Sequence, residues 1–574
     1  MKNETRQCQN CKNDFVIETE DFNFYEKIKV PPPTFCPECR IQRRLAWMPS
    51  ITLFKRKCDL CNKESLSMYE PDAPFTVYCV KCWWSDKWDP TDFGMEYDFS
   101  KPFFEQWREL LAKTPVLGLH VDSSTTQTSP YVNHIAHSKN CYMVYYSDYN
   151  QDSVSDFWLT RCKDLYLCSV ALDSERCFDC SNVFKSYNLA GCLSNNRFCY
   201  DSAFLRDCEG SHHCFGAVNA KNQSYIFMGQ KVSKADYVNK MKEIDLGSYK
   251  QYMFWKNKSL EYFKENIPQP IWETQSVNVT GSYVFKSKNC KDCYDVTGCE
   301  DSKYLMLIRD GVTRDCYDYV DWGLSAELIY ECITVGENVS RIKFSHETGW
   351  NSKDIEYSKS LVGCSDCFGS ISLRNKKYCI LNKEYSKEEY YFLREKIIDH
   401  MEKMPYMSSQ KNPSTGSGQV YKYGEFFPIE FSPHAYNNSF ANFLFPEEKS
   451  NIGKGLKWHD HFFDKYPITM DFSKMPDNIK DTDEKILEEV IQCSSCPRGY
   501  KIVEQELNLA KKLNVPLSRQ CPFCRIEDMI KKWVSNMKQV DRICDKCSID
   551  FMTHYSKEDA PIIYCKSCYQ QEVY

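Results

Sequence analysis

Sixteen of the 33 cysteines lie in eight Cys-x-x-Cys pairs, four pairs near each end of the chain. Two such pairs supply the four thiolates that Zn²⁺ takes in a closed tetrahedral site. At each end, the first two pairs enclose 24 residues and the last two enclose 17. The spacing therefore predicts four zinc ions, held by Cys8, Cys11, Cys36 and Cys39; by Cys58, Cys61, Cys79 and Cys82; by Cys493, Cys496, Cys521 and Cys524; and by Cys544, Cys547, Cys565 and Cys568.

The composition indicates a multidomain protein in a reducing compartment. The 574 residues are several times the usual domain length, so two or more cores are expected. The chain contains 11 Cys-x-x-Cys pairs, where chance would give roughly two. Residues 1–8 offer no apolar signal segment, and no run of about 18 apolar residues could span a membrane. We therefore expect a cytoplasmic location, no membrane partner and thiols free to bind metal.

The two ends of the chain align with each other beyond the cysteines. Residues 8–41 match 493–526 at a constant offset of 485, which pairs Cys36-Pro37-x-Cys39-Arg40-Ile41 with Cys521-Pro522-x-Cys524-Arg525-Ile526. The following parts align at an offset of 486, which pairs Cys58-Asp59 with Cys544-Asp545 and Tyr78-Cys79 with Tyr564-Cys565. The pattern predicts that one two-zinc module is duplicated, with one copy at each end of the chain.

A helix is expected directly after the second cysteine pair of each module. Residues 41–47 and 526–533 are compatible with a helix, and its N-terminal N–H groups would stabilise negative sulfur. A knuckle, a hairpin and then a helix make a treble clef; a two-knuckle ribbon without the helix is the alternative. At about 30 residues per zinc, the metal rather than an apolar core would hold such a module.

These motifs resemble those of a known group of proteins. Cys8-x-x-Cys11, Phe24-Tyr25, Pro31-Pro32-Pro33 and Cys36-Pro37-x-Cys39-Arg40 resemble the probable zinc-ribbon or treble-clef family of many bacterial proteins. The C-terminal copy has Leu509-Ala510 in place of Phe24-Tyr25. The whole layout is similar to uncharacterised multi-zinc proteins predicted in small-genome, uncultivated bacteria. Some of these carry a CoA-transferase-like name, which no residue here supports, and the resemblance implies no established function.

The middle of the chain contains a different repeat. Residues 214–244 align with 367–397 at an offset of 153, which predicts a tandem duplication. An aromatic or aliphatic residue beside Ser, Cys or Asp returns every 10–13 positions. Short strands at this spacing predict coils of about 22–25 residues stacked as a parallel β-solenoid, with a β-sandwich as the alternative. Seventeen cysteines lie here; we interpret them as small buried side chains, although the pairs Cys177/Cys180, Cys290/Cys293 and Cys364/Cys367 could bind metal.

Helices are expected at the end of each repeat and between the modules. Ser233 and Ser386 would cap the first two helices, and Ser100 would cap a third over 101–113 that packs the N-terminal module against the first solenoid. The fold class is thus mainly β and multidomain, with zinc modules at both ends of a duplicated core. The predicted parts are zinc modules at 1–50 and 51–99, a connector at 100–137, solenoids at 138–245 and 286–403, a helical connector at 246–285, a flexible linker at 404–420, an aromatic and Pro-rich extended segment at 421–480, and zinc modules at 481–539 and 540–574.

The sequence favours a binding role over catalysis. It contains no nucleophile elbow, phosphate loop, dinucleotide fingerprint or His-Glu-x-x-His motif, and we name no catalytic residue. His212-His213-Cys214 places neighbours on opposite faces of a strand, and His459 and His461 lack a nearby cysteine pair.

The leading hypothesis is a zinc-stabilised, non-enzymatic binding or scaffold protein that contacts nucleic acid or ribonucleoprotein. The chain as a whole is slightly acidic, with 73 basic and 79 acidic side chains, so this contact needs a local patch. The alternatives are a protein–protein assembly module and, by fold analogy alone, a β-helix enzyme acting on carbohydrate or acyl substrates. The candidate nucleic-acid residues are Arg40, Arg43, Arg44, Lys55, Arg56 and Lys57, with nearby tryptophans available for stacking.

Overall fold

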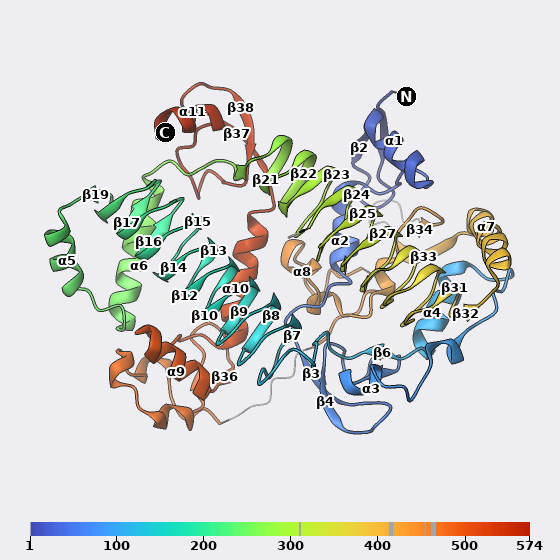
Figure 1. Cartoon of the computed structure of the whole chain (residues 1–574), viewed down its shortest axis with the longest axis horizontal. Coiled ribbons are helices and arrows are strands. Elements are labelled where there is room, and N and C mark those ends of the chain that lie inside the picture. The colour runs from blue at the N-terminus through green and yellow to red at the C-terminus, as the bar shows by residue number, and fades with distance from the viewer. Residues whose placement is uncertain (1, 309–310, 412–417, 454, 461–466, 574) are drawn as a thin grey trace. The chain divides into compact units, whose positions relative to one another are not determined.

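The chain forms two compact units, each built from two separate stretches of sequence (Figure 1). The computed structural model describes residues 2–308, 311–411, 418–453, 455–460 and 467–573. Unit 1 comprises Met1–Leu119 and Trp272–Asp460, and unit 2 comprises His120–Ile271 and His461–Tyr574. The N-terminal cysteine pairs therefore share a unit with the second central repeat, and the C-terminal pairs share a unit with the first. Among the described residues, no helix has the length and apolar character needed to cross a bilayer.

The centre of unit 2 is a 13-stranded sheet within the described residues, parallel except for its last pair, β18 with β19. Its strands are β7 (Asn133–Ala136), β8 (Tyr142–Asp148), β9 (Val154–Thr160), β10 (Lys163–Tyr166), β11 (Ser169–Leu172), β12 (Glu175–Phe178), β13 (Ser181–Phe184), β14 (Tyr187–Ala190), β15 (Asn196–Arg197), β16 (Tyr200–Arg206), β17 (His212–Val218), β18 (Ser224–Phe227) and β19 (Gln230–Lys231). Around it lie α5 (Lys234–Lys242), α6 (Tyr249–Lys264), η4 (Phe472–Lys474), η5 (Ile479–Asp481), η6 (Glu484–Leu487), β35 (Ile491–Gln492), β36 (Gly499–Tyr500), α9 (Glu504–Leu513), α10 (Pro522–Ser535), β37 (Val540–Ile543), β38 (Asp550–Thr553) and α11 (Lys566–Val573).

The centre of unit 1 is an 11-stranded sheet within the described residues, again parallel except for its last pair, β31 with β32. Its strands are β20 (Glu273–Thr274), β21 (Val277–Phe285), β22 (Lys288–Thr297), β23 (Cys299–Lys303), β24 (Thr313–Tyr317), β25 (Ala326–Tyr330), β27 (Val339–Lys343), β29 (Lys353–Glu356), β30 (Ser365–Phe368), β31 (Lys377–Ile380) and β32 (Lys383–Glu384), beside the pair β26 (Val335–Gly336) and β28 (Thr348–Gly349). Around it lie β1 (Glu4–Gln7), β2 (Asp14–Ile17), α1 (Thr19–Ile28), α2 (Pro37–Leu45), β3 (Phe54–Lys57), β4 (Glu64–Ser67), β5 (Val77–Tyr78), α3 (Val80–Trp83), η1 (Pro90–Phe93), α4 (Phe103–Lys113), β6 (Val116–Leu117), α7 (Lys387–Lys403), β33 (Tyr406–Lys411), β34 (Gly418–Tyr421), η2 (Ile429–Phe431), η3 (Tyr436–Asn438) and α8 (Ala441–Leu444).

The repeat length of the two sheets is about half of the predicted value. In unit 2, Lys163 lies beside Glu175 and Glu175 beside Tyr187, so the pairing advances by one constant short step. In unit 1 the corresponding step, between Thr313 and Ala326, is one residue longer. The predicted spacing of the strands agrees with these registers. The predicted coil length of about 22–25 residues is wrong, because each segment pairs with the segment one such step later. In unit 2 this step contains two short strands, since β10 and β11 both precede Glu175.

A left-handed residue at every third position explains how so short a repeat closes. From Thr128 to Asn188, positive φ angles recur at each third residue without interruption. Such residues bend the backbone after every two extended ones, and Asn and Asp tolerate this conformation better than most residue types. However, Tyr146, Trp158 and Val170 also occupy these positions, so the period of three is not visible in residue types.

The cysteines of the central repeats are buried side chains, as expected. All 17, from Cys141 to Cys379, are buried and none forms a disulfide. Serine and asparagine side chains share this interior and accept hydrogen bonds from the backbone one repeat later. Ser147 Oγ accepts from Leu159 N at 2.9 Å, and Asn150 Oδ1 accepts from Cys162 N at 3.0 Å. Each such bond satisfies a buried polar group and links consecutive steps of the repeat.

The helix expected to join the N-terminal module to the first repeat instead packs on the second. Phe103 in α4 lies 5.3 Å from the ring of Tyr357 and 5.2 Å from that of Phe368, both in the unit 1 repeat. The apolar stripe of this helix is buried as predicted. Its N-cap is Pro102 rather than the predicted Ser100, because the hydroxyl of Ser100 donates to Asp98 instead.

The ends of both central sheets carry the predicted helices. Ser233 accepts a hydrogen bond from Asp236 N at the start of α5, and Ser386 accepts one from Glu389 N at the start of α7. The last parallel strand of each sheet, β18 or β31, also pairs with a short antiparallel strand, β19 or β32. This end of each sheet is therefore covered by both a helix and a short strand.

The described residues of the predicted linker contribute to a pair of strands, and the described residues after it are folded. Tyr406 pairs with Tyr421 and Lys411 with Gly418 in the antiparallel strands β33 and β34, whereas residues 412–417 of the predicted linker lie outside the described residues. Beyond β34, the described part of the aromatic segment up to Asp460 belongs to unit 1, where Phe426 and Phe427 are fully buried and contact Trp47, whereas its residues 467–480 belong to unit 2.

Candidate metal centres

Four groups of four cysteines converge at the predicted positions. In each group all four Sγ atoms lie within 4.8 Å of one another; the groups are Cys8, Cys11, Cys36, Cys39; Cys58, Cys61, Cys79, Cys82; Cys493, Cys496, Cys521, Cys524; and Cys544, Cys547, Cys565, Cys568. Among the described residues these are the groups of three or more ligand atoms that could hold a metal ion.

The distances between sulfurs fit a tetrahedral metal site. Cys11 and Cys36 are 3.6 Å apart, Cys496 and Cys521 3.8 Å, and Cys547 and Cys565 3.7 Å. A zinc ion with Zn–S bonds of about 2.3 Å at its centre requires sulfurs about 3.8 Å apart. A disulfide would require about 2.0 Å. The residues present therefore fit Zn²⁺ bound by four thiolates.

Each group begins with the same backbone turn. The first cysteine N–H donates to the carbonyl five residues later at 2.9 Å in all four groups: Cys8 to Asn13, Cys58 to Lys63, Cys493 to Arg498 and Cys544 to Ile549. In three groups the residue after the second cysteine has positive φ, namely Lys12, Asn62 and Ser548. In the remaining group this residue is Pro497, whose ring holds φ negative. The turn still forms in this group, because the hydrogen bond from Cys493 N to the Arg498 carbonyl is kept.

The third cysteine of each group ties the two halves together. Its backbone N–H donates to the sulfur of the first cysteine at 3.3, 3.3, 3.1 and 3.1 Å in the groups that begin at Cys8, Cys58, Cys493 and Cys544. This residue also precedes a helix in every group: α2, α3, α10 and α11 start one residue later. The fourth cysteine then lies in the first helical turn, where free N–H groups stabilise negative sulfur; this was predicted for Cys39 and Cys524 but not for Cys82 and Cys568. The expected hairpin between the first two pairs is replaced in part by helices α1 and α9.

Backbone hydrogen bonds lower the pKa of the first cysteine in the second group of each module, namely Cys58 and Cys544. Burial alone would raise the pKa of the Cys58 thiol, but N–H groups of Cys79, Cys61 and Leu60 lower it to about 7. The same balance of burial against N–H donors lowers the pKa of Cys544 to about 6. Both thiols therefore lose a proton to the metal at lower cost than a free cysteine does.

An aspartate that the alignment matched, but to which no role was assigned, braces the second cysteine group of each module. Asp59 Oδ2 accepts from Val77 N at 2.7 Å, and Asp545 Oδ2 accepts from Ile563 N at 2.7 Å. Arg56, a predicted nucleic-acid residue, is buried, donates to the same Asp59 at 3.0 Å and also binds the Glu70 carbonyl. The repeated Cys-Asp-x-Cys was the feature of the sequence that pointed to this brace.

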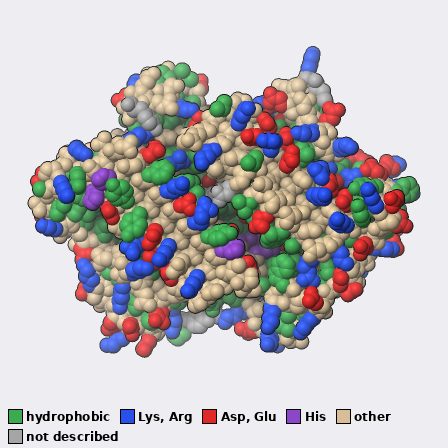
Figure 2. Space-filling model, viewed as in Figure 1, with side chains coloured by type: hydrophobic (Ala, Val, Ile, Leu, Met, Phe, Trp, Pro, Cys, Tyr) green, Lys and Arg blue, Asp and Glu red, His purple; other side chains and the backbone are tan. Residues whose placement is uncertain are grey.

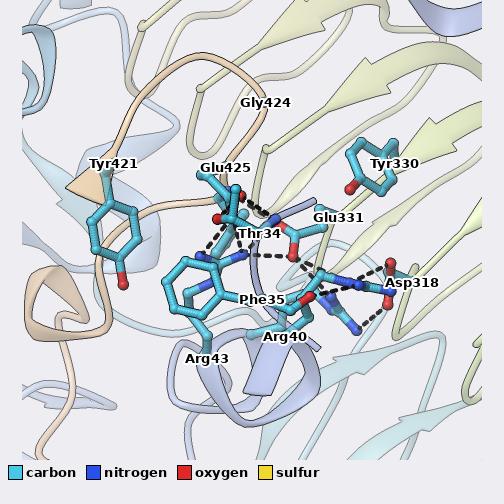
Figure 3. A network of polar contacts seen from close by, with 12 residues as sticks. Thr34, Phe35, Arg40, Arg43, Asp318, Tyr330, Glu331, Tyr421, Gly424 and Glu425 are labelled. Carbon is cyan, nitrogen blue, oxygen red and sulfur yellow. Dashed lines mark hydrogen bonds and ion pairs between the residues drawn. The ribbon is translucent and has the colours of Figure 1, made fainter. Parts of the chain in front are cut away.

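The arginines predicted to contact nucleic acid are buried in unit 1 (Figure 3). The exposed fractions of Arg40, Arg43 and Arg44 are 1%, 2% and 0%. They lie on α2 and point toward the central sheet and the aromatic segment, where the Arg43 guanidinium also stacks 4.2 Å from the centre of the Phe35 ring. These three side chains are not available to a nucleic acid in this structure.

Three carboxylates neutralise the three arginines. Asp318 and Glu331 come from the central repeat and Glu425 from the aromatic segment, and all three are nearly inaccessible to solvent. Burial alone would lower the pKa of Arg43, but Glu331 and Glu425 hold it above its usual value. The ion pairs run from Arg40 to Asp318 at 2.9 Å, from Arg43 to Glu331 at 2.6 Å and to Glu425 at 3.2 Å, and from Arg44 to Asp318 at 3.1 Å.

The C-terminal module uses the matching arginine in the same way. Arg525, which aligns with Arg40, is 3% exposed and pairs with Glu506 at 2.6 Å. Its Nε donates to the Gln520 carbonyl, as the guanidinium of Arg40 donates to the carbonyl of Phe35 five residues earlier. Glu506 also accepts from the hydroxyl of Tyr166 in the unit 2 sheet at 2.6 Å. In both modules the arginine after the Cys-Pro-x-Cys motif links the cysteine-rich module to a central sheet.

The remaining candidates do not form a site. Lys55 and Lys57 are exposed, and Figure 2 shows Lys and Arg side chains mixed with Asp and Glu over the face that it draws. His459 stacks on Phe54 with ring centres 5.0 Å apart, and His461 lies outside the described residues. Neither His212-His213-Cys214 nor the three central Cys-x-x-Cys pairs belongs to a potential metal group among the described residues.

A buried histidine in the C-terminal module makes its stability depend on pH. Burial lowers the pKa of His554 to about 4, although Asp559 partly opposes this. Between pH 4 and 6.5 the unfolded state binds more protons than the folded state, so stability falls as the pH falls through this range. We expect the region around β38 to lose about 2 kcal/mol between pH 7 and pH 5, and the His554→Gln variant to lose much less. Hydrogen exchange of peptides covering β38, corrected for intrinsic rates, measures this difference; equal losses in both proteins would refute it.

Comparisons with known proteins do not identify the chain. No protein-family model matches the sequence, and no curated protein matches it. A solved structure of a "putative acetyltransferase" from Desulfovibrio desulfuricans aligns with 53% of this chain and 78% of its own length, at 11% sequence identity and a TM-score of 0.09. A TM-score this low supports no statement about shared fold or activity. The cysteine groups and the two parallel sheets are therefore what the functional argument rests on.

Proposed function

We propose that this protein is a zinc-stabilised, non-enzymatic scaffold that presents two repetitive β-structures for binding. The observation that carries the proposal is the convergence of sixteen cysteines into four tetrahedral groups. Closed sites of four thiolates fold proteins and leave no open position for a reacting molecule. When bound, each zinc would supply a structural cross-link between a knuckle and the helix that follows it.

We infer that the two ends are copies of one two-zinc treble-clef module. This inference is supported by the hydrogen bonds that the first and third cysteines make in the same way in every group. We further propose that the central sheets are parallel β-solenoids in which one step of the strand register corresponds to one coil. The uniform parallel register favours this over the β-sandwich, whose strands pair antiparallel.

The family resemblance and the location are part of the same proposal. Membership in the multi-zinc proteins of uncultivated bacteria fits the cysteine spacing, and a reducing compartment suits an interior that contains 17 free thiols. In this view each zinc module covers and anchors one solenoid. The surfaces left open on the solenoids are then the candidates for partner contact.

Elemental analysis of the purified protein tests the central claim. We expect four zinc ions per chain, and we expect treatment with a strong chelator to make residues 1–100 and 490–574 sensitive to protease. Two zinc ions or fewer in protein purified without chelator would contradict the proposal. Intact protease resistance after complete zinc removal would contradict the structural role of the metal.

A further inference from the structure

A pocket of about 540 Å³ in unit 2 is formed by residues of β18, α5 and α6 and of the turn between the two helices. Figure 1 shows where α5 and α6 lie beside the end of the central sheet. The zinc groups play no part in the pocket. Its volume falls within the range of about 300–1,000 Å³ that is common for small-ligand sites. It is lined by Phe227 of β18, by Lys240, Glu243 and Ile244 of α5 and its C-terminal end, and by Lys250, Gln251, Phe254 and Trp255 of α6.

Aromatic rings form the apolar part of the pocket; Phe227 and Trp255 pack against the core, whereas Phe254 does not. Helix α6 buries Tyr252, Ser259 and Phe263, whereas Phe254 is 58% exposed. The rings of Phe254 and Trp255 have centres 5.2 Å apart, and Trp255 is 5.8 Å from Phe227. The exposed apolar area of Phe254 is therefore the part of this cluster that a ligand can cover.

Lysines surround these rings without carboxylate partners. The Lys240 ammonium lies 5.0 Å from the centre of the Phe227 ring, and that of Lys258 lies 5.1 Å from the Trp255 ring. Among the described residues neither these lysines nor Lys250 forms an ion pair, whereas Lys256 on the same helix pairs with Asp179. Glu243 is the one acidic residue in the lining. Positive charge next to open aromatic faces is complementary to a planar anion.

We propose that this pocket binds a nucleobase together with its phosphate, as a free nucleotide or as part of a single strand. Phe254 would stack on the base, with Trp255, whose ring is inclined by 78° to that of Phe254, at the edge of the base, and Lys240 and Lys250 would contact the phosphate. Stacking platforms combined with lysines are the usual means by which proteins hold single-stranded nucleic acid without sequence preference. The inference rests on the proposed binding function and moves nucleic-acid contact from the buried arginines of α2 to this open surface of unit 2.

Fluorescence anisotropy of the full-length protein with a labelled oligodeoxythymidine of about twelve nucleotides tests the proposal. We expect binding that weakens with salt. The Phe254→Ala variant is expected to weaken it about fivefold or more, because base stacking is lost. The double variant Lys240→Glu and Lys250→Glu is expected to weaken binding and to reduce the slope of the salt dependence by about 0.7, since both lysines contact one phosphate and each phosphate contact to a single strand contributes about 0.7.

The matched controls lie in the same unit. Lys234→Glu with Lys242→Glu changes the net charge of the chain by the same amount as the pocket double variant but lies outside the pocket lining, and Phe198→Ala removes another ring that is 51% exposed. Both controls should bind as the unaltered protein does. Competition by thymidine monophosphate would identify the pocket as a nucleotide site, and its failure to compete would identify a single-strand site.

The inference is overturned if the oligonucleotide does not bind at low salt, or if the pocket variants and the controls weaken binding equally. Zinc content and thermal stability are measured on the same samples. A protein with four zinc ions that does not bind the oligonucleotide refutes the pocket alone, whereas a protein without zinc refutes the proposed zinc scaffold. The two failures are therefore distinguishable.

Discussion

Replacing Cys39 with serine is expected to lower the zinc content from four ions to three and to unfold the region around α1 and α2. Cys39 is the fourth ligand of its group and lies in the first turn of α2. Zinc bound by four cysteines contributes on the order of 10 kcal/mol to the folding of a small module, which is comparable to the whole stability of a domain. Elemental analysis and limited proteolysis between residues 1 and 50 measure the two effects.

The control for this variant is a cysteine-to-serine change away from the metal groups. Cys299 is fully buried in the unit 1 sheet and belongs to no metal group among the described residues. Cys299→Ser is expected to cost about 1–3 kcal/mol through burial of a hydroxyl, with the zinc content unchanged at four. Four zinc ions in Cys39→Ser would mean that the cluster around Cys8 does not bind metal through this thiol.

Replacing Glu331 with alanine is expected to cost about 3–5 kcal/mol, because it leaves buried arginines without a counter-charge. Glu331 accepts two hydrogen bonds from Arg43, at 2.6 and 2.8 Å, and one from the backbone N–H of Phe426 at 2.8 Å. Its loss removes one of three negative charges that balance three arginines. Hydrogen exchange of the α2 amides should show the destabilisation as faster opening.

A surface ion pair on the same sheet provides the matched comparison. Glu300 pairs with Arg314 at 2.7 Å, and the two side chains are 40% and 50% exposed. Because water screens this pair, Glu300→Ala is expected to cost less than about 1 kcal/mol. If the two glutamate variants opened α2 at the same rate, the buried network would not be what holds the module on the sheet.

The metal groups were predictable because their chemistry is local in sequence. A Cys-x-x-Cys pair forms its turn through hydrogen bonds within six residues, as from Cys8 N to Asn13 O. The equal spacings of 24 and 17 then indicate which pairs belong together. For the same reason the helices after Cys36 and Cys521 could be placed before the structure was known.

The length of the central repeat was not predictable from residue types. The spacing of the strands was visible, but how many residues separate two paired segments depends on the backbone bends between them. These bends occur at left-handed positions that hold Tyr146 and Val170 as well as Asn140 and Asp152. Packing in the stacked sheet overrides the usual preference for Asn, Asp and Gly at such positions.

The role of the basic residues also depended on long-range contacts. Arg40, Arg43 and Arg44 form a cationic helix face in the sequence, where a solvated surface and a nucleic-acid site are indistinguishable. Their partners Asp318 and Glu331 lie far away along the chain, and no local pattern connects them.

Local patterns of residues were enough to specify the four cysteine groups, the short strands of the repeats and the helices that end them, because each depends on neighbours in the chain. Which module packs on which sheet was settled by contacts between distant segments. The N-terminal module joins the second repeat and the C-terminal module joins the first, and charge pairs such as Arg40 with Asp318 and Lys512 with Asp164 connect them. Such pairs form only where the folded surfaces bring complementary charges together and exclude water. The twofold cysteine pattern is therefore sufficient to specify the modules but not their places in the fold.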